Sequence, residues 1–347
     1  MSELLAREPY GPRDDTALVA ELRQLTEHHT GGCPDYRAIT EGAGPIQRIE
    51  DVPYLHVGVF KERRLETTLE GHESGRFLLS SATSGRHSQI RLDEKSSELQ
   101  SQSTKKILSS FLGSEQRPLI VLDSASSLRQ RGKLSARVAA ALSLRPLASN
   151  IVFALSDAED PASMRWEAVE TVLKEHDEVL VYGFSWLLWM AWGNVELPPG
   201  LAKALERTRV SFVHSGGWKN LEAQAVDRER FDEALLAPTA PASVVIDYYG
   251  LVEQVGIIYP LCEAGYRHVP VWADILVRDS LTHESLIDSP GQIQLLNSLA
   301  WGAPYHSVLT EDQGIVEPGV CSCGRSGRRF QLLGRLPRAE ARGCANV

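Results

Sequence analysis

The chain has 347 residues, 43% hydrophobic and 23% charged, which is an ordinary composition for a globular enzyme that needs no disulfides to hold its core. Its 45 acidic and 36 basic residues give a net charge of -9, which argues against binding to a nucleic-acid backbone. The acidic N-terminus is unlike a signal peptide. The longest apolar stretch, 179–192, is shorter than the ~20 residues of a membrane span, so we expect a cytoplasmic protein.

Hydrophobic periodicity predicts an amphipathic helix over residues 14–29. Beyond it, short apolar runs alternate with helical patterns. The runs cover residues 118–123, 150–155, 178–184, 209–217 and 243–250, and the helical patterns lie at 93–113, 161–176 and 219–236. This alternation predicts an α/β fold with a largely parallel sheet covered by helices. From Gln254 onward, shorter runs and polar turns indicate a β-rich subdomain. We expect an α/β core over residues 1–253 and the β-rich subdomain, with a hinge-like tail, over 254–347.

Two small-residue loops stand out in this frame. The segment 77–90, FLLSSATSGRHSQI, places a hydroxyl- and glycine-bearing loop at Ser80–Gly85, where converging N–H and O–H donors suit phosphate oxygens. A Ser/Thr-rich hairpin turn fits the composition equally well. In HSGGWKN (214–220), Gly216 and Gly217 follow a strand-like run. They either let a flat ring or a ribose lie against the backbone or form an ordinary strand-to-helix turn.

Two further segments carry carboxylates. In DYYGLVEQVG (247–256), Tyr249 is suited to stack on a base and Glu253 to bind a hard cation such as Mg²⁺. An aromatic residue at a strand end is also commonly core. In LTEDQG (309–314), Asp312 is suited to chelate the two hydroxyls of a ribose, although a solvated acidic turn is the more common use of such a sequence.

The five cysteines favour metal or thiol chemistry over a disulfide framework. Cys262-x5-His268 and Cys321-x-Cys323 supply four soft ligands in two close pairs, which is the donor set of a closed, structural zinc site. Three reduced bystander thiols and a surface histidine remain the alternative. Cys344, near the end of the chain, is either a nucleophilic thiol or a passenger.

Three tryptophans lie in the apolar stretch, at Trp186, Trp189 and Trp192. Their near-helical spacing is compatible with the lining of an acyl or aryl pocket. Plain core is the more common use of such a pattern, so we expect core.

Taken in order, these segments resemble the adenylate-forming superfamily of acyl-CoA synthetases, peptide-synthetase adenylation domains and firefly luciferase. The closest similarity is to the acyl-protein synthetase of bacterial bioluminescence, the long-chain-fatty-acid–luciferin-component ligase family, with phenylacetate-CoA ligases next. VPYLHVGVFKERRL, SSATSGRHSQI, SGGWKN, CSCGR and GRLPRAEARGC carry the resemblance over residues 45–347. It implies the large N-terminal domain of an adenylate-forming enzyme, with mixed, largely parallel sheets, helices and a β-rich subdomain. It also implies that the small C-terminal lid domain, with its lysine, is absent.

The resemblance assigns site residues as well. It implies that Tyr249 contacts adenine, Asp312 holds the ribose, Arg335 reaches the ribose or phosphate, and Glu253 binds Mg²⁺. Lys219 is a candidate for the cation at the α-phosphate. The nucleotide-binding set as a whole is Ser80, Ser81, Thr83, Ser84, Gly85, Gly216, Gly217, Trp218, Tyr248, Tyr249, Gly250, Asp312 and Arg335. The chain departs from the family pattern at Ala82, where glycine is usual, and at Val252, where threonine is usual.

The implied function is ATP-dependent activation of a fatty or aryl carboxylic acid to acyl-AMP, followed by transfer to a thiol. The acceptor is Cys344 itself or a thiol of a partner reductase or carrier. ATP, Mg²⁺ and structural Zn²⁺ are the expected cofactors, and relatives with Cys, His and Cys-x-Cys ligands favour the zinc assignment. Two alternatives stay open, namely a CoA or carrier-protein ligase of the phenylacetate kind and an inactive, zinc-stabilised nucleotide-binding scaffold.

Overall fold

The computed structural model describes residues 2–68, 75–79, 87–129, 133–218, 223–317 and 319–336, and it divides the chain into two compact units. Unit 1 comprises Met1–Ile107 and Gly250–Val347, and unit 2 comprises Leu108–Tyr249. The expected boundary after residue 253 stays a prediction about domains.

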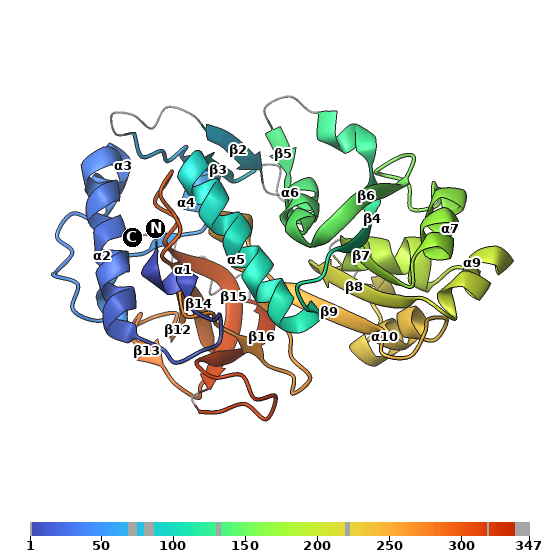
Figure 1. Cartoon of the computed structure of the whole chain (residues 1–347). Helices are drawn as coiled ribbons and strands as arrows, with labels where there is room; N and C mark the ends of the chain where they lie inside the picture. Colours follow the sequence, from blue (N-terminus) through green and yellow to red (C-terminus); the bar gives the residue numbers. More distant parts are fainter. Residues whose placement is uncertain are drawn as a thin grey trace. The chain divides into compact units, whose positions relative to one another are not determined.

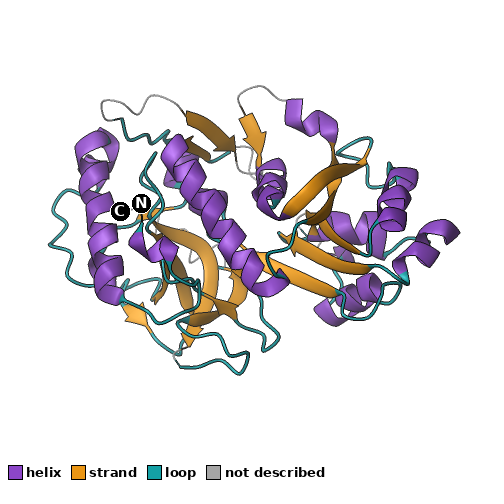
Figure 2. Ribbon diagram, in the orientation of Figure 1, coloured by secondary structure: helices purple, strands orange, loops and turns teal. Residues whose placement is uncertain are grey.

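Unit 2 is built on parallel strands joined by helices, as the alternating runs predict (Figures 1 and 2). Its strands lie in the order β9-β8-β7-β4-β6, and each neighbouring pair is parallel. The strand bounds are β4 (Arg117–Ser124), β5 (Lys133–Ser135), β6 (Ala148–Leu155), β7 (Glu178–Phe184), β8 (Arg209–Ser215) and β9 (Val244–Tyr249). The helices are α6 (Ala136–Ser143), α7 (Trp166–Glu175), α8 (Ser185–Leu188), α9 (Pro199–Leu205) and α10 (Arg228–Leu236), with shorter turns at Ala125–Arg129 and Arg145–Leu147.

Alternation along the strands of unit 2 decides which residues form its core. Ile120, Leu122, Val181 and Phe212 are fully buried and share one core cluster with side chains from α7, α8, α9 and α10, because every second residue of a strand points to the same face. Trp189 and Trp192 belong to this core, in a π-helical turn that follows α8. The expectation that the tryptophans are core is confirmed for these two.

Unit 1 is centred on an antiparallel sheet. The strand order is β11-β16-β15-β14-β12-β13, and β1 pairs with β15 in parallel. The strand bounds are β1 (Leu55–His56), β11 (Arg267–His268), β12 (Ala273–Arg278), β13 (Ser285–Leu286), β14 (Gly291–Asn297), β15 (Ser307–Glu317) and β16 (Arg329–Arg335). The β-rich texture expected after residue 254 is confirmed.

The remaining elements of unit 1 come mainly from its N-terminal half. The helices are α1 (Glu3–Ala6), α2 (Asp15–Gly32), α3 (Pro34–Ile39), α4 (Val59–Glu62) and α5 (Glu94–Leu112), whose residues to 107 belong to this unit. β2 (Gly75–Leu79) pairs antiparallel with β3 (Gln89–Asp93), and short turns occur at Ile49–Asp51 and Val252–Gln254, before β10 (Tyr259–Pro260). The long helices α2 and α5 match the helical patterns at 14–29 and 93–113. Both present apolar faces to the protein interior, and such a face produces the periodic pattern in the sequence.

Candidate functional site

A buried carboxylate marks one part of unit 1. Glu253 lies in the turn after β9 and is only 5% exposed. Burial raises the pKa of its carboxyl group, while the nearby Ser88 side chain and the charge of Lys61 act in the opposite direction, and nearby Glu311 adds to the rise. A buried carboxylate of this kind is stabilised by a cation, and its hard oxygen donors fit the ligand preference of Mg²⁺.

Three more charged side chains join Glu253 through β15 and β16. Asp312 and Arg335 face each other in the register of these strands, with 3.9 Å between Arg335 Nε and Asp312 Oδ1. Arg335 Nη1 also lies 3.5 Å from Glu311 Oε2, and Lys61 Nζ lies 3.8 Å from the same oxygen. We call Lys61, Glu253, Glu311, Asp312 and Arg335 the charge cluster. The structure thus brings together three predicted residues and adds Lys61 and Glu311.

Unit 2 holds the predicted residues at the carboxyl ends of β8 and β9. Gly216 has a φ of +80°, a conformation that glycine adopts without strain, and its carbonyl accepts a hydrogen bond of 2.6 Å from Ser185 Oγ. Ser185 Oγ also lies 2.8 Å from His214 Nδ1. Because the hydroxyl donates to Gly216, the imidazole N–H donates to the hydroxyl. This Ser185–His214 pair was not predicted. Ser185 follows β7 directly, and only knowledge that β7 neighbours β8 reveals the contact.

The aromatic residues of the predicted nucleotide site differ in their surroundings. Tyr248 is buried, and its hydroxyl lies 3.4 Å from that of Tyr182. Tyr249 ends β9, and Gly250 and Gly217 follow β9 and β8 respectively. Trp218 packs edge-on against Trp189, with 6.2 Å between the ring centroids. Part of the Trp218 indole is therefore committed to the core of unit 2.

Several predicted residues lie outside the described residues. They are Ser80, Ser81, Thr83, Ser84, Gly85, Lys219 and Cys344. Residues 80–86 fall in sequence between β2 and β3, which pair antiparallel. Both the hairpin turn and the phosphate-binding role of Ser80–Gly85 stay predictions.

The four predicted soft ligands converge in unit 1, and we call them the thiol cluster. Their ligand atoms all lie within 4.8 Å of one another. Cys262 Sγ is 3.9 Å from Cys321 Sγ, and Cys323 Sγ is 3.2 Å from His268 Nε2. Tetrahedral zinc with bonds of about 2.3 Å to sulfur and about 2.0 Å to nitrogen requires separations of about 3.5–3.8 Å. The observed separations lie on either side of this range, and shifts of about 1 Å or less would bring the four atoms to the distances expected around a zinc ion.

Two tight turns aim the thiols of this cluster. Backbone hydrogen bonds join Gly265 N to Cys262 O and Gly324 N to Cys321 O, and both glycines have positive φ. Burial, followed by the charges of Arg325 and Arg329, lowers the pKa of His268 to about 4. Its imidazole is therefore neutral at pH 7, which is the form that binds metal.

One sequence family matches nearly the whole chain. The family described as acyl-protein synthetase, LuxE, matches residues 21–347. The chain belongs to this family. No curated protein matches it.

Solved structures show the same fold. A 2-hydroxyisobutyryl-CoA ligase, in an open conformation with 2-HIB-AMP and CoA, has a TM-score of 0.65 at 16% identity, covering 95% of this chain and 77% of the other. The same ligase in the postadenylation state, with 2-HIB-AMP, has a TM-score of 0.64 at 16% identity over 95% and 70%. The fold is therefore the mixed α/β fold of adenylate-forming ligases. As a member of its family, the chain is an acid–thiol ligase that activates a carboxylic acid as acyl-AMP and passes the acyl group to a thiol.

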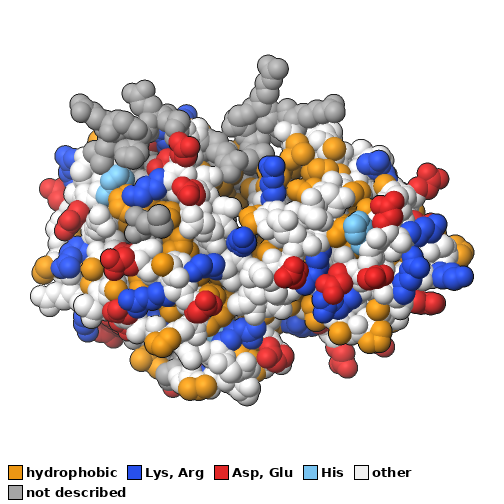
Figure 3. Space-filling model, viewed as in Figure 1, with side chains coloured by type: hydrophobic (Ala, Val, Ile, Leu, Met, Phe, Trp, Pro, Cys, Tyr) orange, Lys and Arg blue, Asp and Glu red, His pale blue; other side chains and the backbone are white. Residues whose placement is uncertain are grey.

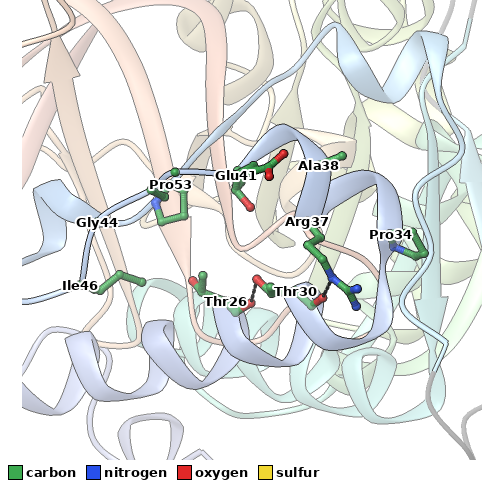
Figure 4. Close-up of a pocket in the computed structure, with 12 residues that line it drawn as sticks. Thr26, Thr30, Pro34, Arg37, Ala38, Glu41, Gly44, Ile46 and Pro53 are labelled. Carbon is green, nitrogen blue, oxygen red and sulfur yellow. Dashed lines mark hydrogen bonds between the residues drawn. The ribbon is translucent and has the colours of Figure 1, made fainter.

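A separate cleft of about 510 Å³ lies in unit 1 between α2, α3 and the loop that follows (Figure 4). Its polar lining is already engaged: Thr30 Oγ1 donates to Thr26 O, and Arg37 donates to the carbonyls of Thr30 and Gly31. We assign no ligand to this cleft.

The surface and the helices bear on the kind of partner. On the face drawn in Figure 3, Lys and Arg side chains of the described residues are interspersed with Asp and Glu side chains. Across the described residues, no helix combines the length and the apolarity that a bilayer span demands.

Proposed function

We propose that this ligase binds ATP through the residues that the family resemblance picks out. In unit 1, Asp312 holds the ribose, Arg335 reaches the ribose or phosphate, and Glu253 binds Mg²⁺. The observation that carries the proposal is the charge cluster, in which Asp312 and Arg335 lie opposite each other at 3.9 Å while Lys61 interacts with the buried Glu253. In unit 2, Tyr249 contacts adenine at the end of β9, with Gly216 and Gly217 at the end of β8.

The reaction proceeds in two displacements. A carboxylate oxygen of the acid attacks the α-phosphorus of ATP, a new P–O bond forms, and the bond to the bridging oxygen breaks as pyrophosphate leaves. A thiolate then attacks the acyl carbonyl, and AMP leaves with the electron pair of the acyl–oxygen bond. Positioning and charge neutralisation provide most of the catalysis in such phosphoryl chemistry. Bound Mg²⁺ supplies positive charge to the phosphate oxygens.

We further propose that zinc occupies the thiol cluster in a structural role. Cys262, His268, Cys321 and Cys323 would supply all four ligands of such an ion, which would leave no position for a substrate. The support is the separation of the ligand atoms and the neutral imidazole of His268. The free cysteines among the described residues suit a reducing compartment, so we place the protein in the cytoplasm.

The substrate is proposed to be a fatty or aryl acid, and the acyl acceptor Cys344 or a thiol of a partner reductase or carrier. Pyrophosphate exchange over a panel of fatty, aryl and amino acids tests the activation step. We expect exchange with one acid class, and exchange with none would favour the inactive scaffold. Glu253→Gln, which keeps the shape of the side chain and removes its charge, should reduce exchange about 100-fold.

The acceptor needs its own experiment. With ATP, Mg²⁺ and the best acid, the wild type should carry a hydroxylamine-labile adduct that Cys344→Ser lacks. Cys33→Ser is the matched control, because Cys33 is buried in the core of unit 1 and is not a member of the thiol cluster. An equal adduct on Cys344→Ser rules out the role. Acid-dependent AMP release that needs added CoA, without any adduct, points instead to a CoA ligase.

A further inference from the structure

The position of Lys61 in unit 1 is fixed by strand pairing. Lys61 lies in α4, directly after β1, and β1 pairs in parallel with β15 through Leu55↔Val308 and His56↔Leu309. The backbone N–H of Val57 adds a hydrogen bond of 2.8 Å to Leu309 O. The segment that bears Lys61 is therefore attached to the strand that bears Asp312, three residues beyond Leu309.

The ammonium group of Lys61 is only loosely held where it lies. Its Nζ is 3.8 Å from Glu311 Oε2, which is an ion-pair distance beyond hydrogen-bonding range. Arg335 approaches the same carboxylate more closely, at 3.5 Å. Lys61 is 28% exposed, and its charge also lowers the pKa of Glu253 against the effect of burial. A flexible four-carbon stem lets such an ammonium group move between neighbouring anions.

Neighbouring cations of the same part of unit 1 are committed elsewhere. Arg64 and Arg91 both pair with Glu66, and Arg63 pairs with Asp35 at 3.4 Å. Lys95 lies 3.1 Å from the ring centroid of Trp301. Arg335 also makes no close ion pair, at 3.5 Å from Glu311 and 3.9 Å from Asp312, but the register of β15 and β16 places it opposite Asp312, the proposed ribose ligand.

The histidine of the same segment adds a donor. His56 Nδ1 accepts a hydrogen bond of 3.1 Å from Gly58 N, so the proton of the neutral ring is on Nε2. This Nε2 is buried and has no hydrogen-bond partner among the described residues. A donor and a cation therefore come from one short segment beside β15, the strand that bears Asp312, and an oxyanion requires such a combination.

We propose that Lys61 is the catalytic cation of adenylation. Its ammonium group leaves Glu311 and contacts the α-phosphate of ATP as negative charge builds on the phosphate oxygens. The inference rests on the proposed function, because it takes ATP to lie at Glu253 and Asp312. It assigns to Lys61 the role for which the sequence offered Lys219. Lys61 was overlooked because nothing in the sequence VFKERR distinguishes it from a surface lysine.

The test separates the two half-reactions. Lys61→Met should lower the rate constant of acid-dependent pyrophosphate exchange about 100-fold, with transfer from preformed acyl-AMP to the thiol within about threefold of wild type. Lys61→Arg, which keeps the charge, should recover exchange to within about tenfold. Binding of ATP with Mg²⁺, measured by calorimetry, should weaken less than exchange falls, because the contact strengthens as the reaction proceeds.

Lys174→Met is the matched control, since Lys174 is an exposed lysine that pairs with Glu170 in α7, and its exchange should be unchanged. Exchange by Lys61→Met within threefold of wild type overturns the inference. The inference is also overturned if Lys219→Met loses exchange while Lys61→Met keeps it. Equal loss of both half-reactions by Lys61→Met, with a lowered melting temperature, overturns it as well, because that result indicates a structural role. A wild type that exchanges with no acid overturns the proposed function, and this inference with it.

Discussion

Unit 1 contains a buried histidine in the thiol cluster and, elsewhere, a buried pair of histidines. They are alike in burial and differ in their surroundings. His268, in the thiol cluster, is fully buried, and its Nε2 faces the sulfur of Cys323 at 3.2 Å. His29 and His306, which we call the imidazole pair, are also fully buried, and their rings stack with 4.9 Å between centroids. His268 lies among cysteine sulfurs, whereas the polar partners of the imidazole pair are oxygen atoms.

Oxygen atoms are the hydrogen-bond partners of three of the four ring nitrogens of the imidazole pair, and His306 Nδ1 has no partner among the described residues. His29 donates through Nε2 to Ala300 O at 2.9 Å and accepts through Nδ1 from Thr67 Oγ1 at 2.7 Å. His306 Nε2 lies 3.1 Å from Thr26 Oγ1, whose own proton goes to Leu22 O. Burial lowers the pKa of both rings, so both are neutral at pH 7. Burial of a histidine alone does not indicate a metal site, and the partner atoms decide the matter.

Removing metal from the thiol cluster should have the largest effect on the stability of the protein among the tests of these two groups. Cys323→Ser, or a chelator applied to the wild type, should lower the melting temperature by about 10 °C or more, since structural zinc supplies about 10 kcal/mol of binding free energy in small zinc domains. Metal analysis of the purified protein should give one zinc per chain. Cys33→Ala is the control and should keep the zinc. Unchanged stability and no bound metal would return the thiol cluster to bystander thiols.

The second-largest expected effect is a loss of stability in acid, caused by the imidazole pair. Burial is the main cause that lowers the pKa of His29 well below 6.5, and burial together with nearby His28 lowers the pKa of His306 to about 3. The unfolded chain therefore binds protons below pH 6.5 that the folded chain does not. Stability should be full above pH 6.5 and fall as the pH drops towards about 3, by at most about 1.4 kcal/mol per pH unit for each ring.

Urea unfolding at pH 7, 6 and 5 measures this slope. His306→Gln should reduce the slope by about one proton relative to wild type. The exposed His87 is outside the pair, and His87→Gln should leave the slope unchanged. Equal slopes for all three proteins would show that other groups, such as paired carboxylates, cause the acid sensitivity.

Local patterns explain what the sequence could predict. The parallel strands of unit 2 were located because each is a contiguous apolar run, such as residues 178–184, whereas the three-residue β5 has no such run and was missed. The thiol cluster was predicted because Cys321-x-Cys323 is local and soft ligands have few other uses. The imidazole pair and the Lys61–Glu311 contact join residues about 250 or more positions apart. Only the pairing of distant elements, such as β1 with β15, brings such residues together, and no short pattern encodes that pairing.

The turns that aim the thiols give the smallest expected effect. Gly324 has a φ of +83°, and a Cβ added there would meet nothing within 4 Å. Gly324→Ala should therefore cost only the strain of the left-handed conformation, about 1–2 kcal/mol, and should weaken zinc binding by about tenfold. Gly44→Ala is the control, because that position also has open space and its φ is not positive. A chelator competition that finds equal zinc affinity for both variants would mean that the sulfurs keep their positions without the glycine turn.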